Sequence, residues 1–420
     1  MSKGRATRAV VVASLVLLTA AACSNNNSSS NSNSPSPGGA TVPSITIASF
    51  SSSTPSAMGQ FKALVAAATK NANSLQVGVV LPDTTSSTRY TDFDAPDLKK
   101  AFVAAGYTPS QYKIENAQGS DATQLSMATA DINQGAKVLV VDPIDGPSGV
   151  AVAKLAQSKG VQLISYDRAT FQGTNTYYVS FNNELVGETI GKGFTNCVSS
   201  WGVSKPKVYV LNGGEDTDPN AISFAEGYNK VVWGKAAKSV AAGATNSKGY
   251  SLVQENFAPA WNNTQGGTIF QQAFTAHPEI NATIEANDGL ANSVITVLKS
   301  AGVKAKTIPT VGQDATAQGM AWTLMDYQCG SVYKPILVEA QAAVSLASIL
   351  LAGKTPPSAF LNGTTTDPTN SSVSEPAVLL TPVWVDKTNM EQTVVKDKEP
   401  TAKDICAIAG ASVCSQNGIS

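Results

Sequence analysis

Two kinds of hydrophobic pattern alternate along the chain from Leu75 onward. Short runs rich in Val, Ile and Tyr end in Asp, Asn, Pro or Gly, which is typical of buried strands; examples are LQVGVVLPD (75–83), KVLVVDP (137–143) and VQLISYD (161–167). Longer Ala-rich amphipathic stretches lie between them, such as residues 290–302 and 336–353. This alternation predicts βαβ units, and therefore parallel sheets covered by helices on both faces.

Polar residues directly follow many of these predicted strands. In a parallel α/β sheet, ligands bind in the crevice beyond the carboxyl ends of the strands. A single Asp or Asn at such a place often only caps the next helix. The shared position of the whole set predicts a polar ligand-binding crevice instead; the set comprises Asp83, Asp142, Asp145, Asp167, Arg168, residues 212–220, Asn287, Asp288, Gln313 and Asp314.

Composition and charge narrow the class of partner. The 420 residues are 42% hydrophobic and 14% charged, enough to bury more than one core. The net charge is −1 and no long basic run is present, which argues against nucleic acid or an anionic membrane surface as the main partner. A small uncharged ligand is therefore expected.

The sequence lacks the motifs of the common catalytic and metal sites. There is one histidine, His277, and no GxSxG motif, so a nucleophilic triad is not expected. GETIGKG (187–193) has the wrong spacing for a phosphate loop and lies in a helical pattern, and DTDPN (216–220) is followed by residues that do not suit a calcium loop. We expect a non-enzymatic binding protein without cofactor or metal; a secreted carbohydrate-active enzyme is the alternative.

The N-terminus has the pattern of an export signal. Basic residues in MSKGRATR precede an apolar run from Ala9 to Ala22, which is too short to cross about 30 Å of hydrocarbon. Ala20 to Cys23 resembles a bacterial lipobox, which implies a signal peptide over residues 1–22 and a lipid on Cys23 at the outer face of the cell membrane. A plain secretory cleavage site is the alternative. Residues 23–73 are interpreted as tether and linker, with a Ser/Asn/Pro/Gly-rich start.

The remaining cysteines predict disulfides. Cys197, Cys329, Cys406 and Cys414 are an even number in an exported chain, which allows two disulfides in three connectivities. We favour Cys406 with Cys414, which are close in sequence, and Cys197 with Cys329. The absence of CxxC spacing and the single histidine argue against a zinc site.

Taken together, the strand-end motifs resemble one family, the type I periplasmic sugar-binding proteins of ABC transporters, and within it the D-xylose-binding branch. The resemblance extends over roughly residues 75–400 in consistent order. It is carried by VLVVDPIDG, LISYDRAT, YYVSFNNELVGE, LNGGEDTDPNA, EANDGLANSVITVLKSAG, VGQDATAQG, SVYKPI and LLTPVWVD.

The resemblance implies a fold and a function. The fold is two Rossmann-like lobes with parallel sheets, joined by a three-strand hinge; residues 75–181 and 335–382 form the N-terminal lobe, and residues 182–333 and 383–420 form the C-terminal lobe. The function is that of a monomeric, extracytoplasmic lipoprotein that closes around a monosaccharide and delivers it to an ABC transporter permease. Xylose is favoured over glucose, ribose and other aldoses. A sugar sensor that signals to a membrane receptor kinase is the alternative.

The resemblance also implies a set of ligand-binding residues: Arg89, Tyr90, Asp167, Arg168, Asp218, Asn220, Trp261, Asn287, Asp314 and Lys334. Sugar hydroxyls both donate and accept hydrogen bonds, so carboxylates opposite Arg and Lys suit them. Trp261 and Tyr90 offer flat apolar faces to a sugar ring. Tyr90 stands where xylose-binding proteins tend to have Trp, and the preceding loop DTTSST (83–88) is small and polar where a charged loop is expected, which leaves the preference among pentoses open.

Overall fold

The computed structural model describes residues 40–171 and 176–420. The expected signal peptide, the expected lipidation site at Cys23 and the expected polar tether up to residue 39 lie outside the described residues. None of the helices in the described ranges is both long and apolar enough to cross a membrane.

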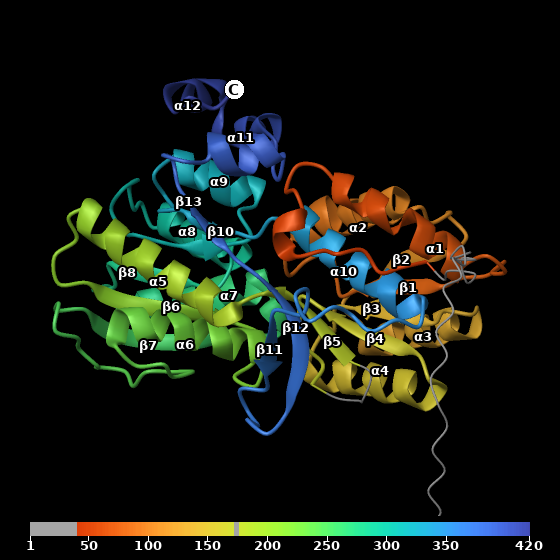
Figure 1. The fold of residues 1–420 in the computed structure, drawn as a ribbon. Helices are drawn as coiled ribbons and strands as arrows, with labels where there is room; N and C mark the ends of the chain where they lie inside the picture. The colour runs from red at the N-terminus through yellow and green to blue at the C-terminus, as the bar shows by residue number, and fades with distance from the viewer. Residues whose placement is uncertain (1–39, 172–175) are drawn as a thin grey trace, which may run out of the picture. The chain divides into compact units, whose positions relative to one another are not determined.

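The first half of the fold is built on a seven-stranded sheet (Figure 1). Its strand order is β11-β12-β5-β4-β3-β1-β2, and all neighbouring strands are parallel except the β11–β12 hairpin. The strands are β1 (Val77–Leu81), β2 (Tyr112–Asn116), β3 (Val138–Val141), β4 (Gln162–Tyr166), β5 (Thr176–Phe181), β11 (Gly363–Thr366) and β12 (Ser374–Leu380).

Helices cover both faces of this sheet, as the continuously apolar strands predict. Val77 and Val79 belong to the hydrophobic core that includes α2 (Ala95–Ala105) and α10 (Ile336–Leu351). Val80 packs in the separate core under α3 (Asp121–Asn133) and α4 (Gly146–Lys159), because successive side chains of a strand point to opposite faces. Figure 1 shows α3 and α4 on one side of the strands and α2 and α10 on the other.

The second half contains two three-stranded sheets rather than one continuous sheet. One has the order β7-β6-β8 and is parallel; the other has the order β13-β10-β9, with β13 antiparallel to β10. The strands are β6 (Lys207–Gly213), β7 (Ser251–Ala258), β8 (Ala282–Glu285), β9 (Gly312–Gln313), β10 (Ser331–Tyr333) and β13 (Val383–Val385); the helices are α5 (Asn183–Ser200), α6 (Pro219–Trp233), α7 (Asn263–Ala276), α8 (Asp288–Ser300) and α9 (Ala317–Leu324). The sheets are thus mostly parallel, as predicted, with antiparallel strands added at the edges.

The chain passes three times between the two halves. It leaves β5 for α5 at Asn182, returns from β10 to α10 at Lys334–Pro335, and passes from β12 to β13 at Thr381–Pro382. Each half is therefore built from two segments that are far apart in the sequence.

The segment from residue 40 to residue 73, interpreted from the sequence as part of a linker, packs on the first half. It contains η1 (Ile47–Ser49), η2 (Ser56–Phe61) and α1 (Lys62–Ala68). Met58, Phe61 and other apolar side chains of this segment are fully buried in the core that also contains α2 and α10. The three- and four-residue spacing of these side chains gives the segment an apolar face that has to be covered.

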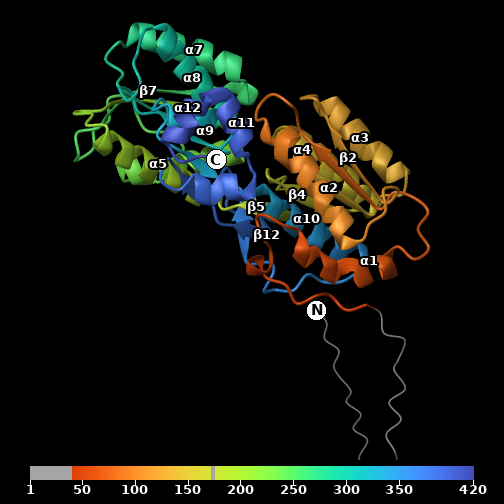
Figure 2. The same ribbon diagram turned by 90° about the horizontal axis from the view of Figure 1, so that it is seen from above.

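A C-terminal extension covers α9. It comprises η5 (Glu391–Val395), α11 (Ala402–Ala409) and α12 (Ala411–Gln416), and Figure 2 shows α11 and α12 beside α9. Ile405 of α11 and Met320 of α9 share one hydrophobic cluster.

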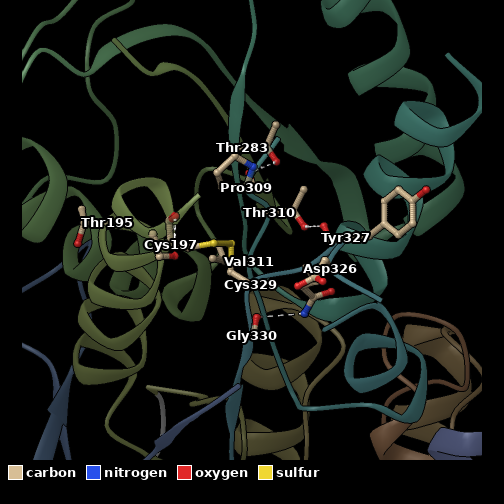
Figure 3. The surroundings of a disulfide bond; sticks show 12 residues. Thr195, Cys197, Thr283, Pro309, Thr310, Val311, Asp326, Tyr327, Cys329 and Gly330 are labelled. Carbon is tan, nitrogen blue, oxygen red and sulfur yellow. Dashed lines mark hydrogen bonds between the residues drawn. A yellow bond between two sulfur atoms is a disulfide. The ribbon is translucent and has the colours of Figure 1, made fainter. Parts of the chain in front are cut away.

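Both predicted disulfides are present. Cys406 and Cys414 join α11 to α12 across 8 residues, and Cys197 joins α5 to Cys329 across 132 residues. Figure 3 shows the second bond, which fixes α5 to the segment that precedes β10. The same segment is held by the backbone N–H of Cys329, which donates to the carbonyl oxygen of Thr310 at 2.9 Å. Cross-linking such distant positions restricts the unfolded chain more than the folded one.

The GETIGKG segment lies inside α5, where its glycines allow close packing against α6. A Cβ atom on Gly187 would overlap the carbonyl oxygen of Phe224, and one on Gly227 would overlap the carbonyl oxygen of Glu184. The two helix backbones therefore approach each other at a point that has no room for a side chain.

The substitution Gly187→Ala should destabilise the protein by about 3 kcal/mol or more, because the α5 and α6 backbones must move apart. Gly146→Ala is the matched control: Gly146 begins α4 and a Cβ there meets nothing within 4 Å. The control should leave the free energy of unfolding unchanged or slightly raised. Urea denaturation of both variants measures the difference, and equal midpoints would contradict the packing argument.

Candidate ligand-binding site

A polar cavity lies at the carboxyl ends of strands from both halves of the fold. Its lining comes from the segments that follow β1, β4, β6, β7, β8, β9 and β10: Ser86, Ser87, Arg89, Tyr90, Asp167, Arg168, Asn220, Phe224, Trp261, Asn287, Gln313, Asp314 and Lys334. The crevice rule for parallel sheets therefore locates the cavity correctly.

The structure brings the sequence-predicted site residues together, with one exception. All of them line this cavity except Asp218, which is not part of the lining and lies behind Trp261. Its carboxylate is not offered to the cavity as the sequence interpretation assumed.

Four lining residues were not among the predicted site residues. Ser86 and Ser87 belong to the DTTSST loop, and Gln313 belongs to the polar residues at strand ends, so all three carried a signal in the sequence. Phe224 carried none, because an apolar residue in the amphipathic helix α6 is indistinguishable from an ordinary core residue.

Arg89 is the centre of a buried ion cluster beneath the cavity. It is 1% exposed and forms four hydrogen bonds. Two go to the carboxylate of Asp94 at 2.8 Å, one to Asp167 at 2.8 Å and one to Glu339 at 2.9 Å. A guanidinium has five N–H groups, so only one remains for a ligand. In this structure Arg89 holds three carboxylates in place, and its ligand contact stays a prediction.

Asp167 connects this cluster to the cavity. Its side chain accepts from Arg89 and from the hydroxyl of Tyr90 at 3.1 Å, and Lys334 Nζ lies 3.7 Å away. Burial alone would raise the pKa of the Asp167 carboxyl, but Arg89, Lys334 and Arg168 together hold it well below its usual range. Asp167 is therefore ionised and acts as an acceptor only.

Arg168, the next residue, is held more loosely. Among the described residues its side chain has one hydrogen bond, to the carbonyl oxygen of Pro143 at 3.1 Å, and an ion-pair contact of 3.7 Å with Asp142. Its guanidinium carbon lies 5.7 Å from the centroid of the Tyr90 ring. Arg168 is thus fixed in place while most of its N–H groups remain for a ligand.

On the opposite wall, Asp314 pairs with Lys334 and Ser87. Lys334 Nζ lies 2.9 Å from one carboxylate oxygen of Asp314, and the Ser87 hydroxyl donates to the other at 2.8 Å. The backbone of Asp314 has a φ of 88°, a left-handed conformation that its surroundings must hold in place.

Asp288 holds that strained segment. It is 1% exposed and accepts hydrogen bonds from the backbone and hydroxyl of Thr316 at 2.7 and 3.1 Å, and from Gln328 and Ser331 at 2.8 Å. Burial raises the pKa of Asp288 to about 7, although these donors oppose the shift. Asp288 therefore positions Asp314 through Thr316 and supports β10, which leads to Lys334.

Asparagine side chains form hydrogen bonds across the cleft between the two halves. Asn263 donates to the carbonyl oxygen of Thr85 at 3.0 Å, Asn287 to that of Ser86 at 3.3 Å, and Asn220 to that of Asp167 at 3.1 Å. The first two of these contacts and the Ser87–Asp314 bond join the DTTSST loop to the opposite wall of the cavity.

The chemistry of the cavity suits an uncharged, hydroxyl-rich ligand. Carboxylates that only accept face cations that only donate, and the side-chain amides of Asn220, Asn287 and Gln313 can do both. Trp261 adds an apolar face. Gln313 has a buried side-chain oxygen without a hydrogen-bond partner among the described residues, so a ligand hydroxyl can satisfy it.

Comparison with known proteins shows the family to which this chain belongs. Residues 77–355 match the family model described as the periplasmic binding protein domain. This chain therefore belongs to the periplasmic binding proteins, which are substrate-binding proteins rather than enzymes, and its fold is their type I fold.

Individual relatives are similar over most of their length. The D-xylose-binding periplasmic protein of Escherichia coli (strain K12) is 31% identical over 285 residues, 68% of this chain and 80% of the relative. The multiple sugar-binding periplasmic receptor ChvE of Rhizobium radiobacter is 29% identical over 328 residues, 76% of this chain and 89% of the relative. The crystal structure of a carbohydrate transporter solute binding protein from Chloroflexus aurantiacus in complex with D-glucose has a TM-score of 0.65 and 25% identity, covering 79% of this chain and 98% of that one.

Replacing Arg89 by Met should lower the free energy of unfolding by about 3–5 kcal/mol, because buried carboxylates lose their shared cation. Arg168→Met is the matched control and should cost about 1 kcal/mol or less, since burial already raises the pKa of its neighbour Asp142 well above the usual range and that carboxyl can remain neutral. Guanidinium denaturation compares the two. Similar losses in the two variants would show that Arg89 contributes no more to the free energy of unfolding than Arg168 does.

Stability should also depend on the protonation of Glu339. Three carboxylates around one guanidinium cannot all be ionised at low cost, and burial with the neighbouring Asp167 and Asp94 raises the pKa of Glu339 to about 8 despite Arg89. The folded protein holds this proton above pH 4.5, where the unfolded chain releases it, so the stabilisation is present at low pH and is lost as pH rises towards 8. Glu339→Gln should come close to the native protein near pH 5 and exceed its free energy of unfolding by roughly 4 kcal/mol at pH 9, because each unit of pKa shift corresponds to about 1.4 kcal/mol. A constant difference across this range would contradict the assignment.

Proposed function

We propose that this protein binds a monosaccharide for an ABC sugar importer, with D-xylose or a similar aldose as the ligand. The observation that carries the proposal is the convergence of fixed donors, acceptors and one indole face on a single cavity between the two halves of the fold. Buried polar groups that find no partner cost about 1–3 kcal/mol each, so such a cavity selects a ligand with matching hydroxyls.

The relatives support a sugar as ligand and differ in which one. Their names give D-xylose in one case and multiple sugars in another, and the solved structure holds D-glucose. Xylose is proposed first because the xylose-binding relative reaches 31% identity. This chain departs from the pattern expected of xylose-binding proteins at Tyr90 and in the DTTSST loop. A difference in sugar preference from those proteins would arise at these positions.

We also propose that the two halves are lobes that move about a hinge made by the three chain passages. The boundaries between the lobe ranges expected from the sequence fall at or beside Asn182, Lys334–Pro335 and Thr381–Pro382, where the chain passes from one half to the other. These three passages are therefore the proposed pivots of the hinge. A ligand shifts such an equilibrium only through contacts that differ between the open and closed states. A sugar that touches Arg168 in one lobe and Asp314 in the other provides that difference.

The proposed location is the outer face of the cell membrane. Two features of the sequence support it: the export signal over residues 1–22 and Cys23 at the end of the lipobox-like segment. The proposed partner is the permease of the importer, which would recognise the closed form of a monomer. One relative is named a receptor, so a sugar sensor for a membrane kinase is the second candidate; a permease encoded beside this protein would favour the importer.

Titration calorimetry against D-xylose, D-glucose, D-ribose and L-arabinose tests the proposal directly. We expect at least one aldose to bind, and Arg168→Met to weaken its binding about 100-fold or more, because charge-assisted hydrogen bonds to the ring are lost. Lys154→Ala removes an exposed positive charge from α4 and should bind as the native protein does. Unchanged affinity in Arg168→Met would remove Arg168 from the site, and the absence of binding by every monosaccharide would refute the proposed ligand class.

A further inference from the structure

Trp261 is held in the cavity wall by a hydrogen bond at its far edge. The indole is 5% exposed, and its Nε1–H donates to one carboxylate oxygen of Asp218 at 2.8 Å. The edge of the Phe224 ring, with a centroid distance of 6.2 Å and an interplanar angle of 78°, supports a second side. The orientation of the indole plane in the wall is therefore set by Asp218, which does not line the cavity, and by Phe224, which lines it beside the indole.

The other carboxylate oxygen of Asp218 has a different task. It caps α6 by accepting from the backbone N–H groups of Asn220 at 2.8 Å and Ala221 at 3.1 Å. This cap fixes Asn220, whose side chain lines the cavity and donates to the carbonyl oxygen of Asp167. A single carboxylate thus positions an aromatic wall and an amide of the same cavity.

The loop that carries Asp218 is shaped around the indole. A Cβ atom on Gly213 would overlap the Trp261 ring, and one on Gly214 would lie 2.9 Å from Trp261 Nε1. Ala260 and Trp261 have φ values of 51° and 56°, a left-handed conformation that is unfavourable for both residues. Glu215 from the same loop accepts from the backbone N–H of Ala260 at 3.0 Å. The strained backbone and the indole are held by one loop.

We propose that Asp218 is a positioning residue, which does not touch the ligand and acts through Trp261 and Asn220. The inference rests on the proposed function, in which a sugar ring lies against the indole. Both oxygens of Asp218 must accept, and only a carboxylate offers two acceptors at this spacing; asparagine would point an N–H group at either the indole N–H or the helix N-terminus. An aspartate here fixes the face against which the sugar C–H groups pack.

Asp218→Ser separates the two tasks, because serine still caps α6 but has no second acceptor for the indole. We expect the melting temperature to change little and the affinity for the best aldose to fall about 10-fold. In the Trp261→Phe background, which has no indole N–H, the same Asp218→Ser change should have almost no further effect. An equal loss of affinity in both backgrounds would overturn the proposal.

A spectroscopic measurement keeps this test separate from the proposed function. The proton NMR signal of the Trp261 indole N–H, assigned by its absence in Trp261→Phe, should move upfield in Asp218→Ser without any sugar present. An unchanged signal would overturn the positioning role even if sugar binds. Binding of no aldose together with a shifted signal would refute the proposed ligand, while the Asp218–Trp261 link would stand.

Discussion

The site depends on one buried guanidinium. Arg89 joins the loop after β1 to the ends of β4 and α10, because its partners Asp94, Asp167 and Glu339 come from all three places. Buried charges are stable only when they are paired and hydrogen-bonded, so the strand ends are fixed relative to one another before any ligand is present. Asp167 and Arg168 then enter the cavity from a rigid base.

The opposite wall of the cavity has the same arrangement, in which one residue faces the cavity and another supports it. Asp288 lies behind Asp314 and Lys334 as Arg89 lies behind Asp167, and Asp218 lies behind Trp261. In each case a polar side chain with several partners holds a residue that faces the cavity. Such support restricts the cavity side chains to the geometry that a ligand needs and reduces the entropy lost on binding.

Much of this arrangement could be predicted from the sequence. The strand and helix periods predicted the parallel sheets, and the polar residues after each strand predicted the cavity, because parallel strands bring their carboxyl ends to one edge. The support behind the cavity could not be predicted. Glu339 lies 250 residues from Arg89, and in the sequence it cannot be told from an acidic residue on the exposed face of a helix. The sequence around Asp218 is the same whether its carboxylate contacts a ligand or a tryptophan. The packing of residues 40–73 on the first half could not be predicted either, because a short apolar pattern does not reveal which surface it covers.

Two of the hydrogen bonds across the cleft go to main-chain atoms of the loop after β1. Asn263 and Asn287 address the carbonyl oxygens of Thr85 and Ser86, which every residue possesses, and not their side chains. Substitution of Ser86, which lines the cavity, can therefore reshape the lining while its main-chain hydrogen bond across the cleft is kept. The loop after β1 can therefore change the contacts that it offers to a ligand while the hydrogen bonds that join it to the opposite wall stay in place.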